Sequence, residues 1–340
     1  MRLERCVVAA PIVALATIVA GVAGTQHVDV RFRDPDNVAA GYVAMVGAAV
    51  ILLVGLDIYL RARKLEGGAT RENLRAVREE RWTWRRGVGV AVGLLSFYAA
   101  YMAYRNLKAI VPLLEPHRIV DDGLAKADRA LFFGNDPAKL LHGIPGTAVW
   151  TQIFSTFYVA FIVFLPLSLA IALVFAPSLE ASLLLTTAFS LNWLIGAASY
   201  FALPSLGPVY ADPHLFAALP HSEVTHLQQV LLDQRTAYLA HPGHGTPQAI
   251  AAFASLHIAM SFTALLVARQ LDAPQRLKQF LWIWLVITFV ATVFLGWHYV
   301  LDDVAGLAIG AIALILARVM TGVSPRRARL GQQAKTAVAA

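Results

Sequence analysis

The chain has 340 residues, of which 58% are hydrophobic and only 14% are charged, and its mean hydropathy is +0.61. These values exclude an ordinary soluble domain, in which about a quarter of the residues are charged. The net charge of +7 does not indicate nucleic acid, because the basic residues gather beside apolar segments, where anionic lipid is their expected partner. We therefore expect an all-α, polytopic membrane helix bundle without a nucleic-acid partner.

Eight apolar stretches approach the roughly 20 residues that a membrane-spanning helix needs. They cover residues 6–23, 38–60, 87–104, 148–176, 181–203, 249–267, 280–297 and 304–320. The first stretch follows Arg2 and Arg5 and ends in small residues, as a signal peptide does. Because its apolar run exceeds the roughly 7 to 15 residues of a signal core, we expect an uncleaved span.

The basic residues predict the orientation of the bundle. Arginine and lysine crowd the loop 61–86, the short loop 269–278 and the tail after residue 318. The positive-inside rule places all three in the cytoplasm, so 105–147 and 205–248 are expected on the extracytoplasmic side of the plasma membrane. The chain then divides into two N-terminal spans with a basic loop (1–86), a six-span catalytic core (87–320) and a basic, disordered tail (321–340).

Two outer segments carry informative patterns. After the third span, apolar residues such as Leu124 and Leu131 recur at helical spacing while Asp121 and Asp128 occupy other positions, which predicts an amphipathic helix lying on the outer leaflet. The loop 205–248 holds five histidines, but their spacing matches no established ligand pattern and the loop has no cysteine. We expect no metal there.

A first polar motif, Ser255-Leu256-His257, lies in the sixth apolar stretch. Ser255 is a favourable N-cap, which would place His257 in the first turn of a helix. Free backbone N–H groups and the helix dipole at such an end favour an anion, phosphate above all. A histidine held there can donate a proton to a leaving oxygen.

A second polar motif joins His298 to Asp302, four residues later. Positions i and i+4 lie about 40° apart on a helix, so the two side chains can share a face while Asp303 points elsewhere. A carboxylate so placed fixes the tautomer of an imidazole and makes it a competent nucleophile toward phosphorus. Because the sixth span runs inward from His257 and the seventh returns outward, both histidines are expected near the same outer surface.

Each of these residues has an ordinary structural explanation when it is taken alone. A histidine at the end of a spanning helix is usually interfacial, and Trp297 and Tyr299 fit an aromatic belt. An aspartate at a helix start stabilises the helix dipole. The combination of both motifs on one side of the membrane favours a functional site.

At these residues the chain resembles a known family. Ser255-Leu256-His257 and His298-x3-Asp302 are similar to the second and third signature motifs of the type 2 phosphatidic acid phosphatase superfamily. The serine-leucine-histidine form, with Thr292 where the phosphatases usually have arginine, resembles the inositol phosphorylceramide synthase (aureobasidin-resistance)-like inositolphosphotransferase branch. The proline-rich segment 200–210 and the segment 127–137 are similar to further parts of this superfamily, and the resemblance covers roughly residues 95–320.

The resemblance implies a six-helix core and a phosphotransferase that works through a phosphohistidine. His298 would be the nucleophile, Asp302 its orienting partner and His257 the general acid. The implied substrate is a phospholipid or polyprenyl phosphate, from which inositol phosphate is one candidate for transfer. A polyol or lipid alcohol would be the acceptor, and neither a cofactor nor a metal is expected.

The phosphate-binding residues follow the family less closely. The first motif of the phosphatases, a lysine followed by an arginine-proline pair, is absent, and Ala254 stands where proline is usual. Another cation must therefore neutralise the phosphate. Our candidates for phosphate or substrate binding are Arg105 and Lys108 at the outer end of the third span, Arg235 in the outer loop, Ser255 and Tyr210.

Three alternatives stay open at this point. In a lipid phosphate phosphatase of the same superfamily, water would replace the acceptor alcohol, and the sequence does not show which of the two the site admits. In a membrane transporter, His298 and Asp302 would relay protons or gate a path. A scaffold without chemistry is the third alternative.

Overall fold

The computed structural model describes residues 2–242 and 249–323, and within these ranges the chain forms helices and connecting segments without a strand. Seven helices of this described part are long and apolar enough to cross a membrane. They are α1 (Arg2–His27), α2 (Val43–Ala62), α4 (Trp84–Leu114), α7 (Thr147–Phe175), α8 (Leu179–Ala202), α12 (Gln275–Phe294) and α13 (Val300–Thr321). The predicted all-α, polytopic membrane bundle is confirmed.

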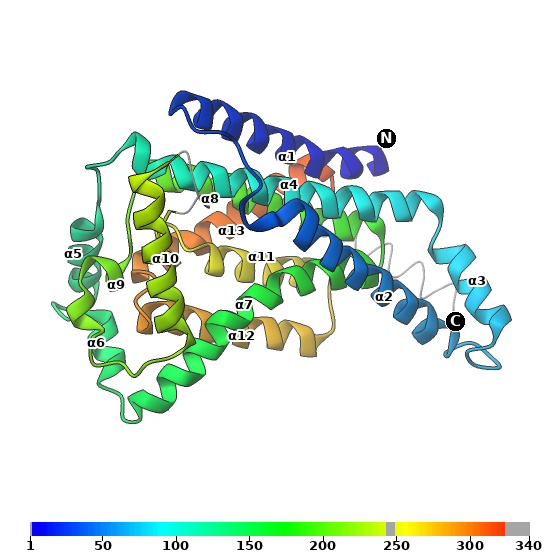
Figure 1. Ribbon diagram of the computed structural model, residues 1–340. Coiled ribbons are helices and arrows are strands. Elements are labelled where there is room, and N and C mark those ends of the chain that lie inside the picture. The colour runs from blue at the N-terminus through cyan, green and yellow to red at the C-terminus, as the bar shows by residue number, and fades with distance from the viewer. Residues whose placement is uncertain (1, 243–248, 324–340) are drawn as a thin grey trace.

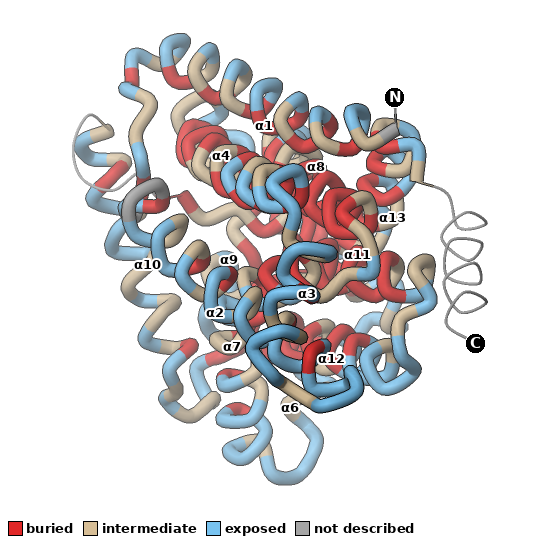
Figure 2. Tube along the Cα trace, turned by 90° about the vertical axis from the view of Figure 1, so that its right-hand side faces the viewer, coloured by how far each residue is buried: buried red, intermediate tan, exposed pale blue. Residues whose placement is uncertain are grey.

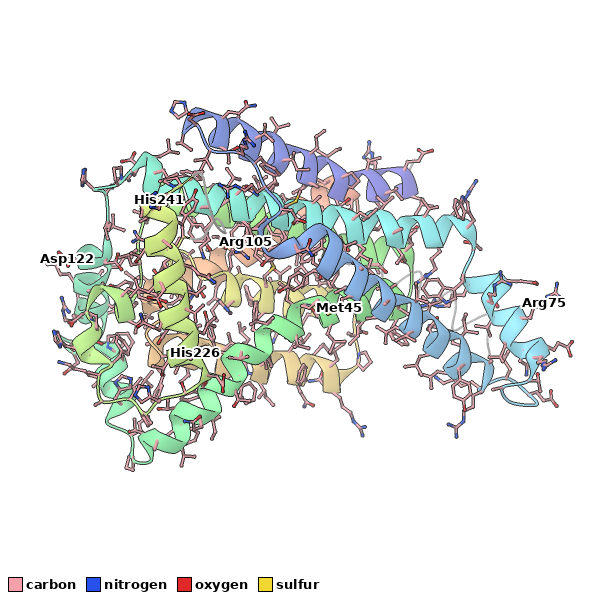
Figure 3. All side chains as sticks on the ribbon, in the orientation of Figure 1. Met45, Arg75, Arg105, Asp122, His226 and His241 are labelled. Atoms are coloured by element: carbon pink, nitrogen blue, oxygen red, sulfur yellow. The ribbon has the colours of Figure 1, made fainter. Side chains whose placement is uncertain are left out.

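The shorter helices gather at the two ends of this bundle, except α11, which lies within it (Figure 1). They are α3 (Arg71–Arg81), α5 (Asp121–Leu131), α6 (Pro137–His142), α9 (Pro208–Ala211), α10 (Glu223–Ala240) and α11 (Leu256–Gln270), with single turns at Pro35–Asn37, Val38–Tyr42 and Pro213–Leu215. The basic helix α3 lies at one end, whereas α5, α6, α9 and α10 cover the other. Figure 3 accordingly shows Arg75 and Asp122 far apart, with Arg105 nearer to Asp122.

The predicted sixth span differs from the structure. Residues 249–255 are not helical, and α11 has only 15 residues, which is short for a complete crossing. The backbone of this segment is bonded to other parts of the chain, because the N–H groups of Ala252 and Phe253 donate to Ser205 and that of Ala254 donates to Ser199. These hydrogen bonds hold residues 252–254 against the segment 199–205.

The core lies where α8, α11 and α13 meet, and Figure 2 shows buried residues concentrated there. Two glycines allow α13 to approach α11 closely, since a Cβ on Gly306 would lie 2.4 Å from the carbonyl oxygen of Ser255, and one on Gly310 would lie 2.7 Å from that of Ala259. Small residues at such a crossing are typical of membrane helices. The close contact fixes the start of α11 relative to the start of α13.

Two predictions on chain organisation stay as they were. The three-part division at residues 86 and 320 is a prediction that the helix bounds alone do not test. The predicted disordered tail falls, from residue 324 onward, outside the described residues, and so does His244 of the outer loop.

Candidate active site

The site forms where two loops meet at the end of the bundle that α5, α9 and α10 cover. The chain leaves α12 at Phe294, turns at Gly296, whose φ of +74° suits glycine, and enters α13 with Tyr299 as the N-cap. His298 is thus one residue before the cap, and Asp302 is in the first turn. The Nδ1 atom of His298 lies 3.4 Å from Oδ2 of Asp302, so the predicted pair is brought together.

Asp302 also has a structural role. Its Oδ2 atom accepts a hydrogen bond of 2.9 Å from the backbone N–H of Tyr299, which caps α13, and the residue is fully buried. Its other oxygen, Oδ1, has no hydrogen-bond partner within the described residues, and neither does Nδ1 of His298. Asp303 points elsewhere, as expected, and accepts a hydrogen bond from the hydroxyl of Thr292 at 2.7 Å.

His257 lies beside His298. Ser255 is the N-cap of α11, as predicted, and His257 is in its first turn. The two imidazole rings have their centroids 6.0 Å apart. The backbone N–H of Ser255 donates to the carbonyl of Asp302 at 3.0 Å, so one hydrogen bond ties the two motifs together.

Aromatic side chains that the sequence analysis missed enclose the pair. Tyr158 of α7 lies between His257 and Trp297, with ring centroids 4.6 Å from the first and 4.8 Å from the second, and its ring is nearly parallel to that of Trp297. Phe161, one turn further along α7, also contacts His257, with ring centroids 4.3 Å apart. These rings cover part of the imidazole of His257, which remains half-buried.

Burial controls the protonation of His298, which lies in the connection between α12 and α13. It lowers the pKa of His298 from its ordinary value of 6.5 to about 3. The positive charge of Lys108 lowers this pKa further, and a hydrogen bond with the backbone of Ala252 opposes the shift. His298 is therefore neutral at physiological pH, which is the form a nucleophile requires.

The amphipathic helix predicted near residue 120 is present as α5, but two of its aspartates face the protein. Asp121, Leu124 and Asp128 form its buried face, and Leu131 is exposed. The two aspartates point inward because their carboxylates accept hydrogen bonds from backbone N–H groups of other segments. Their spacing of seven residues, on one face with Leu124, was the signal available in the sequence.

These two aspartates hold the loops of the site. Both oxygens of Asp128 accept hydrogen bonds from the first turn of α13, from the N–H groups of Val300 at 2.7 Å and Leu301 at 3.1 Å. Asp121 accepts hydrogen bonds from the backbone of Leu206 and Gly207, and from the hydroxyl of Tyr299 at 3.1 Å. The backbone N–H groups at the start of α13 therefore already donate to a carboxylate of the protein itself.

The two predicted cations of the third span lie inside a helix, because α4 continues to Leu114. The Arg105 side chain donates to the hydroxyl of Tyr101, and the ammonium of Lys108 lies 5.7 Å from the ring centroid of Tyr200. The influence of Lys108 on the pKa of His298 places its charge close to the histidines. Lys108 is thus the better placed of the two.

The two remaining candidates differ in their relation to the histidines. Tyr210 packs edge-on against Trp297 and donates from its hydroxyl to the carbonyl of Gln228, so it borders the site. Arg235 lies on α10 and lines a separate cavity of about 20 Å³ that includes neither histidine. Within the described residues, no group of three or more histidine, cysteine, aspartate or glutamate side chains has the arrangement of a metal site.

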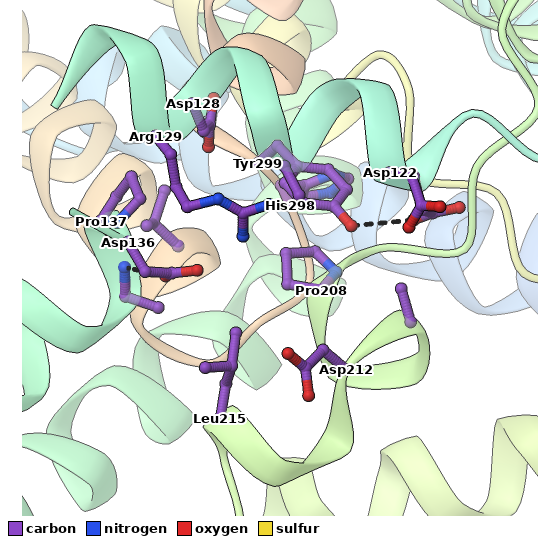
Figure 4. Close-up of a pocket in the computed structure, with 15 residues that line it drawn as sticks. Asp122, Asp128, Arg129, Asp136, Pro137, Pro208, Asp212, Leu215, His298 and Tyr299 are labelled. Carbon is purple, nitrogen blue, oxygen red and sulfur yellow. Dashed lines mark hydrogen bonds between the residues drawn. The ribbon is translucent and has the colours of Figure 1, made fainter. Parts of the chain in front are cut away.

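A larger cavity of about 200 Å³ opens beside His298 and Tyr299 (Figure 4). Its other walls come from α5, from the start of α6 and from α9 with the residues that follow it. These walls combine aspartates and one arginine with alanines, prolines, a leucine and a valine. The cavity connects the neighbourhood of His298 with the outside of the helix bundle.

Comparison with known proteins agrees with the geometry. The family model described as the PAP2 superfamily matches residues 122–316, which is more than half of the chain and includes both histidine motifs. No curated protein and no solved structure shows significant similarity to the chain. With an all-helical membrane bundle and the two histidine motifs side by side, the chain belongs to the PAP2 superfamily.

Proposed function

We propose that this protein is an integral membrane phosphotransferase that acts on a phospholipid or polyprenyl phosphate through a phosphohistidine at His298. Membership of the PAP2 superfamily and the apolar helices support a membrane phosphatase-like enzyme. The observation that carries the proposal is the pair of imidazole rings 6.0 Å apart, one of which faces the carboxylate of Asp302. Both rings are close enough to contact a single phosphoryl group.

The start of α11 is the place for the phosphate. No hydrogen bond among the described residues uses the backbone N–H groups of Leu256, His257 or Ile258. Such N–H groups at a helix start favour an anion. The start of α13 does not compete, because Asp128 and Asp302 already accept from its N–H groups.

The proposed reaction has two steps. In the first, Nε2 of His298 attacks phosphorus, the bond to the departing alcohol breaks, and the alcohol oxygen takes a proton from the imidazolium of His257. In the second, the acceptor hydroxyl attacks phosphorus, the N–P bond breaks, and the acceptor gives its proton to His257. Asp302 faces Nδ1 of His298 and stabilises the positive charge that the ring acquires.

Lys108 supplies the positive charge that the missing first motif would have provided. Its ammonium is within electrostatic reach of His298, and Arg105 is one turn away on the same helix. Ser255, the N-cap of α11, and Tyr210, which packs against Trp297, complete the proposed substrate site.

The reaction is proposed for the extracytoplasmic side of the plasma membrane. The basic helix α3 lies at the end of the bundle opposite α5, α9 and α10 (Figure 1). By the positive-inside rule that basic end belongs in the cytoplasm, which leaves the histidines at the outer end.

A test of the proposal is covalent trapping. Purified protein incubated with ³²P-labelled lipid phosphates should acquire label that is stable to base and labile to acid, as phosphohistidine is. His298→Ala should abolish the label, whereas His226→Ala, which changes an exposed histidine on α10, should not. Full turnover by purified His298→Ala on every lipid phosphate that the parent converts would refute the proposal.

The same preparation separates a transferase from a hydrolase. Labelled protein is chased either with buffer alone or with added inositol, glycerol or a lipid alcohol. Release of label into a new phosphodiester or phosphomonoester supports the transferase, and inositol as the best acceptor would support the inositolphosphotransferase branch. Release only as inorganic phosphate, at a rate that the alcohols do not change, identifies a phosphatase.

A further inference from the structure

An open cavity of about 330 Å³ lies where α11 is connected to α12. Its walls come from the last turn of α11 and the start of α12, and the lining residues are Arg269, Gln275, Lys278, Gln279 and Trp282. Because α11 begins beside the histidines and α12 returns to them, this connection lies at their far ends from the active site (Figure 1). The positive-inside rule assigns that side to the cytoplasm.

The cavity gathers positive charge from two helices. No hydrogen bond or ion pair among the described residues engages the guanidinium of Arg269, whose central carbon lies 5.9 Å from the ring centroid of Trp282. The ammonium of Lys278 has one partner, the exposed carboxylate of Asp272 at 3.3 Å. Such a surface pair contributes little free energy, so both cations can turn to a ligand.

The start of α12 adds backbone donors. Its N-cap, Pro274, provides no side-chain hydrogen bond, and the N–H groups of Leu277 and Lys278 donate to the carbonyl of Pro274. Within residues 2–242 and 249–323, the N–H groups of Gln275 and Arg276 have no acceptor. Free N–H groups at the start of a helix of 20 residues favour an anion.

These features select the class of ligand. Two cations and the positive end of a helix dipole attract an anion and repel a metal ion. The side-chain amides of Gln275 and Gln279 are neutral donors that suit its oxygens. A phosphate group has several acceptor oxygens and forms strong, charge-assisted hydrogen bonds with arginine and lysine. The cavity therefore has the donors that a phosphate group requires.

The face of α12 that lines the cavity continues as an apolar surface. Trp282 and Val286 follow Lys278 at intervals of four residues and so lie on the same face of the helix. Both side chains are exposed on the outside of the bundle, and tryptophan is typical of the membrane interface. A phosphate group in the cavity with a hydrocarbon chain along α12 would contact both parts, whereas free phosphate would contact only the first.

We propose that this cavity binds the phosphate group of an anionic phospholipid of the cytoplasmic leaflet, between Arg269, Lys278 and the start of α12. Basic pockets between spanning helices on the cytoplasmic side suit anionic headgroups. The positive-inside rule alone requires only that basic residues gather at this end, and not that any of them forms a site. The proposal does not depend on the phosphohistidine, because the cavity lies at the other end of α12.

Photoaffinity labelling tests the location of the lipid. The full-length protein is reconstituted in phosphatidylcholine nanodiscs that contain phosphatidylglycerol with a diazirine near its headgroup, and mass spectrometry identifies the labelled peptides. Label should appear within residues 269–282, and unlabelled phosphatidylglycerol should displace it whereas further phosphatidylcholine should not. Because each peptide is measured separately, lipid bound near His298 does not contribute to this signal.

Three substitutions distinguish a site from a general attraction. Arg269→Gln and Lys278→Gln should each raise the phosphatidylglycerol content needed for half-maximal labelling about tenfold, the effect of losing a hydrogen bond between charged groups. Arg276→Gln is the matched control, because Arg276 has the same charge in the first turn of α12 but does not line the cavity. It should be labelled as the parent is.

Three results would overturn the proposal. Label that is absent from residues 269–282 would show that no lipid binds there. Equal losses in Arg276→Gln, Arg269→Gln and Lys278→Gln would show a general attraction between basic residues and an anionic membrane. Displacement by inorganic phosphate as effective as that by phosphatidylglycerol would assign the cavity to free phosphate and not to a lipid.

Discussion

The close crossing of α11 and α13 predicts a large effect for one methyl group. Gly306→Ala places a Cβ 2.4 Å from the carbonyl oxygen of Ser255 and 3.1 Å from Cβ of Ile258. Both neighbours belong to the start of α11, which carries His257. The substitution therefore acts on the position of one histidine relative to the other.

The size of the effect follows from the distances. Close contacts between carbon and a carbonyl oxygen are about 3.3 to 3.6 Å long, so a contact of 2.4 Å requires a displacement of about 1 Å. Overpacking of this kind costs about 1–3 kcal/mol of stability. A misplacement of about 1 Å between catalytic groups can lower the rate about 100-fold, so activity should suffer more than stability.

The assay compares two glycine variants in purified form. Gly306→Ala should lower kcat about 100-fold and the rate of phosphohistidine formation with it, while the protein still unfolds cooperatively at a modestly lower Tm. Gly55→Ala is the matched control, because it lies inside the spanning helix α2 and its Cβ would meet no atom within 4 Å. It should leave both quantities unchanged.

A Gly306→Ala protein that keeps the kcat of the parent would contradict the reasoning, since the two histidines would then tolerate a shift of their supporting helices. Equal losses of kcat and Tm in the Gly55→Ala protein would also contradict the reasoning. The cause would then be an alanine in a membrane helix and not the crossing of α11 and α13.

Further predictions concern the residues of the site. Asp302→Asn should lower kcat by less than His298→Ala does, since the carboxylate orients the imidazole and does not itself attack; single-turnover kinetics of both variants would reveal the reverse order. Lys108→Gln should raise the KM for the lipid phosphate more than Asp128→Asn does, which steady-state kinetics would measure. Asp128→Asn should lower the free energy of unfolding by about 1–3 kcal/mol, because an amide oxygen replaces only one of two carboxylate acceptors, and an unchanged denaturation midpoint would contradict this. Burial lowers the pKa of His298 from 6.5 to about 3, so below pH 6.5 the unfolded chain binds a proton that the folded chain does not. The stability of the fold should therefore fall as the pH drops below 6.5. Thermal melts between pH 7 and pH 5 should show a smaller pH dependence for His298→Gln than for the parent.

The sequence was most informative where the signal is local. Apolar runs of spanning length predicted the membrane helices, and the only span that fell short, 249–267, did so because its first residues form hydrogen bonds with Ser199 and Ser205. The start of α11 at Ser255 was predicted from the N-cap preference of serine, although the Ser255 side chain forms no capping hydrogen bond. These features depend on a few neighbouring residues.

The supporting residues of the site were beyond local reasoning. Asp128 caps α13 across 172 residues of sequence, and Tyr158 stacks on His257 from a different span. An aspartate in an amphipathic pattern is ordinarily assigned to the solvated face, because its burial is costly without a partner. Only the fold reveals that two backbone N–H groups, of Val300 and Leu301, donate to the buried carboxylate of Asp128.

The His298 and Asp302 pair shows why a correct prediction can rest on an incomplete reason. The two residues were expected to share one face of a helix, yet α13 begins only at Val300 and His298 precedes its cap. Their approach arises because Asp302, in the first turn, turns back to cap the N–H of Tyr299 with the same oxygen that faces His298. In the proposed reaction the capping bond would hold the carboxylate still while the imidazole changes its charge, so the start of α13 would serve as the rigid part of the site.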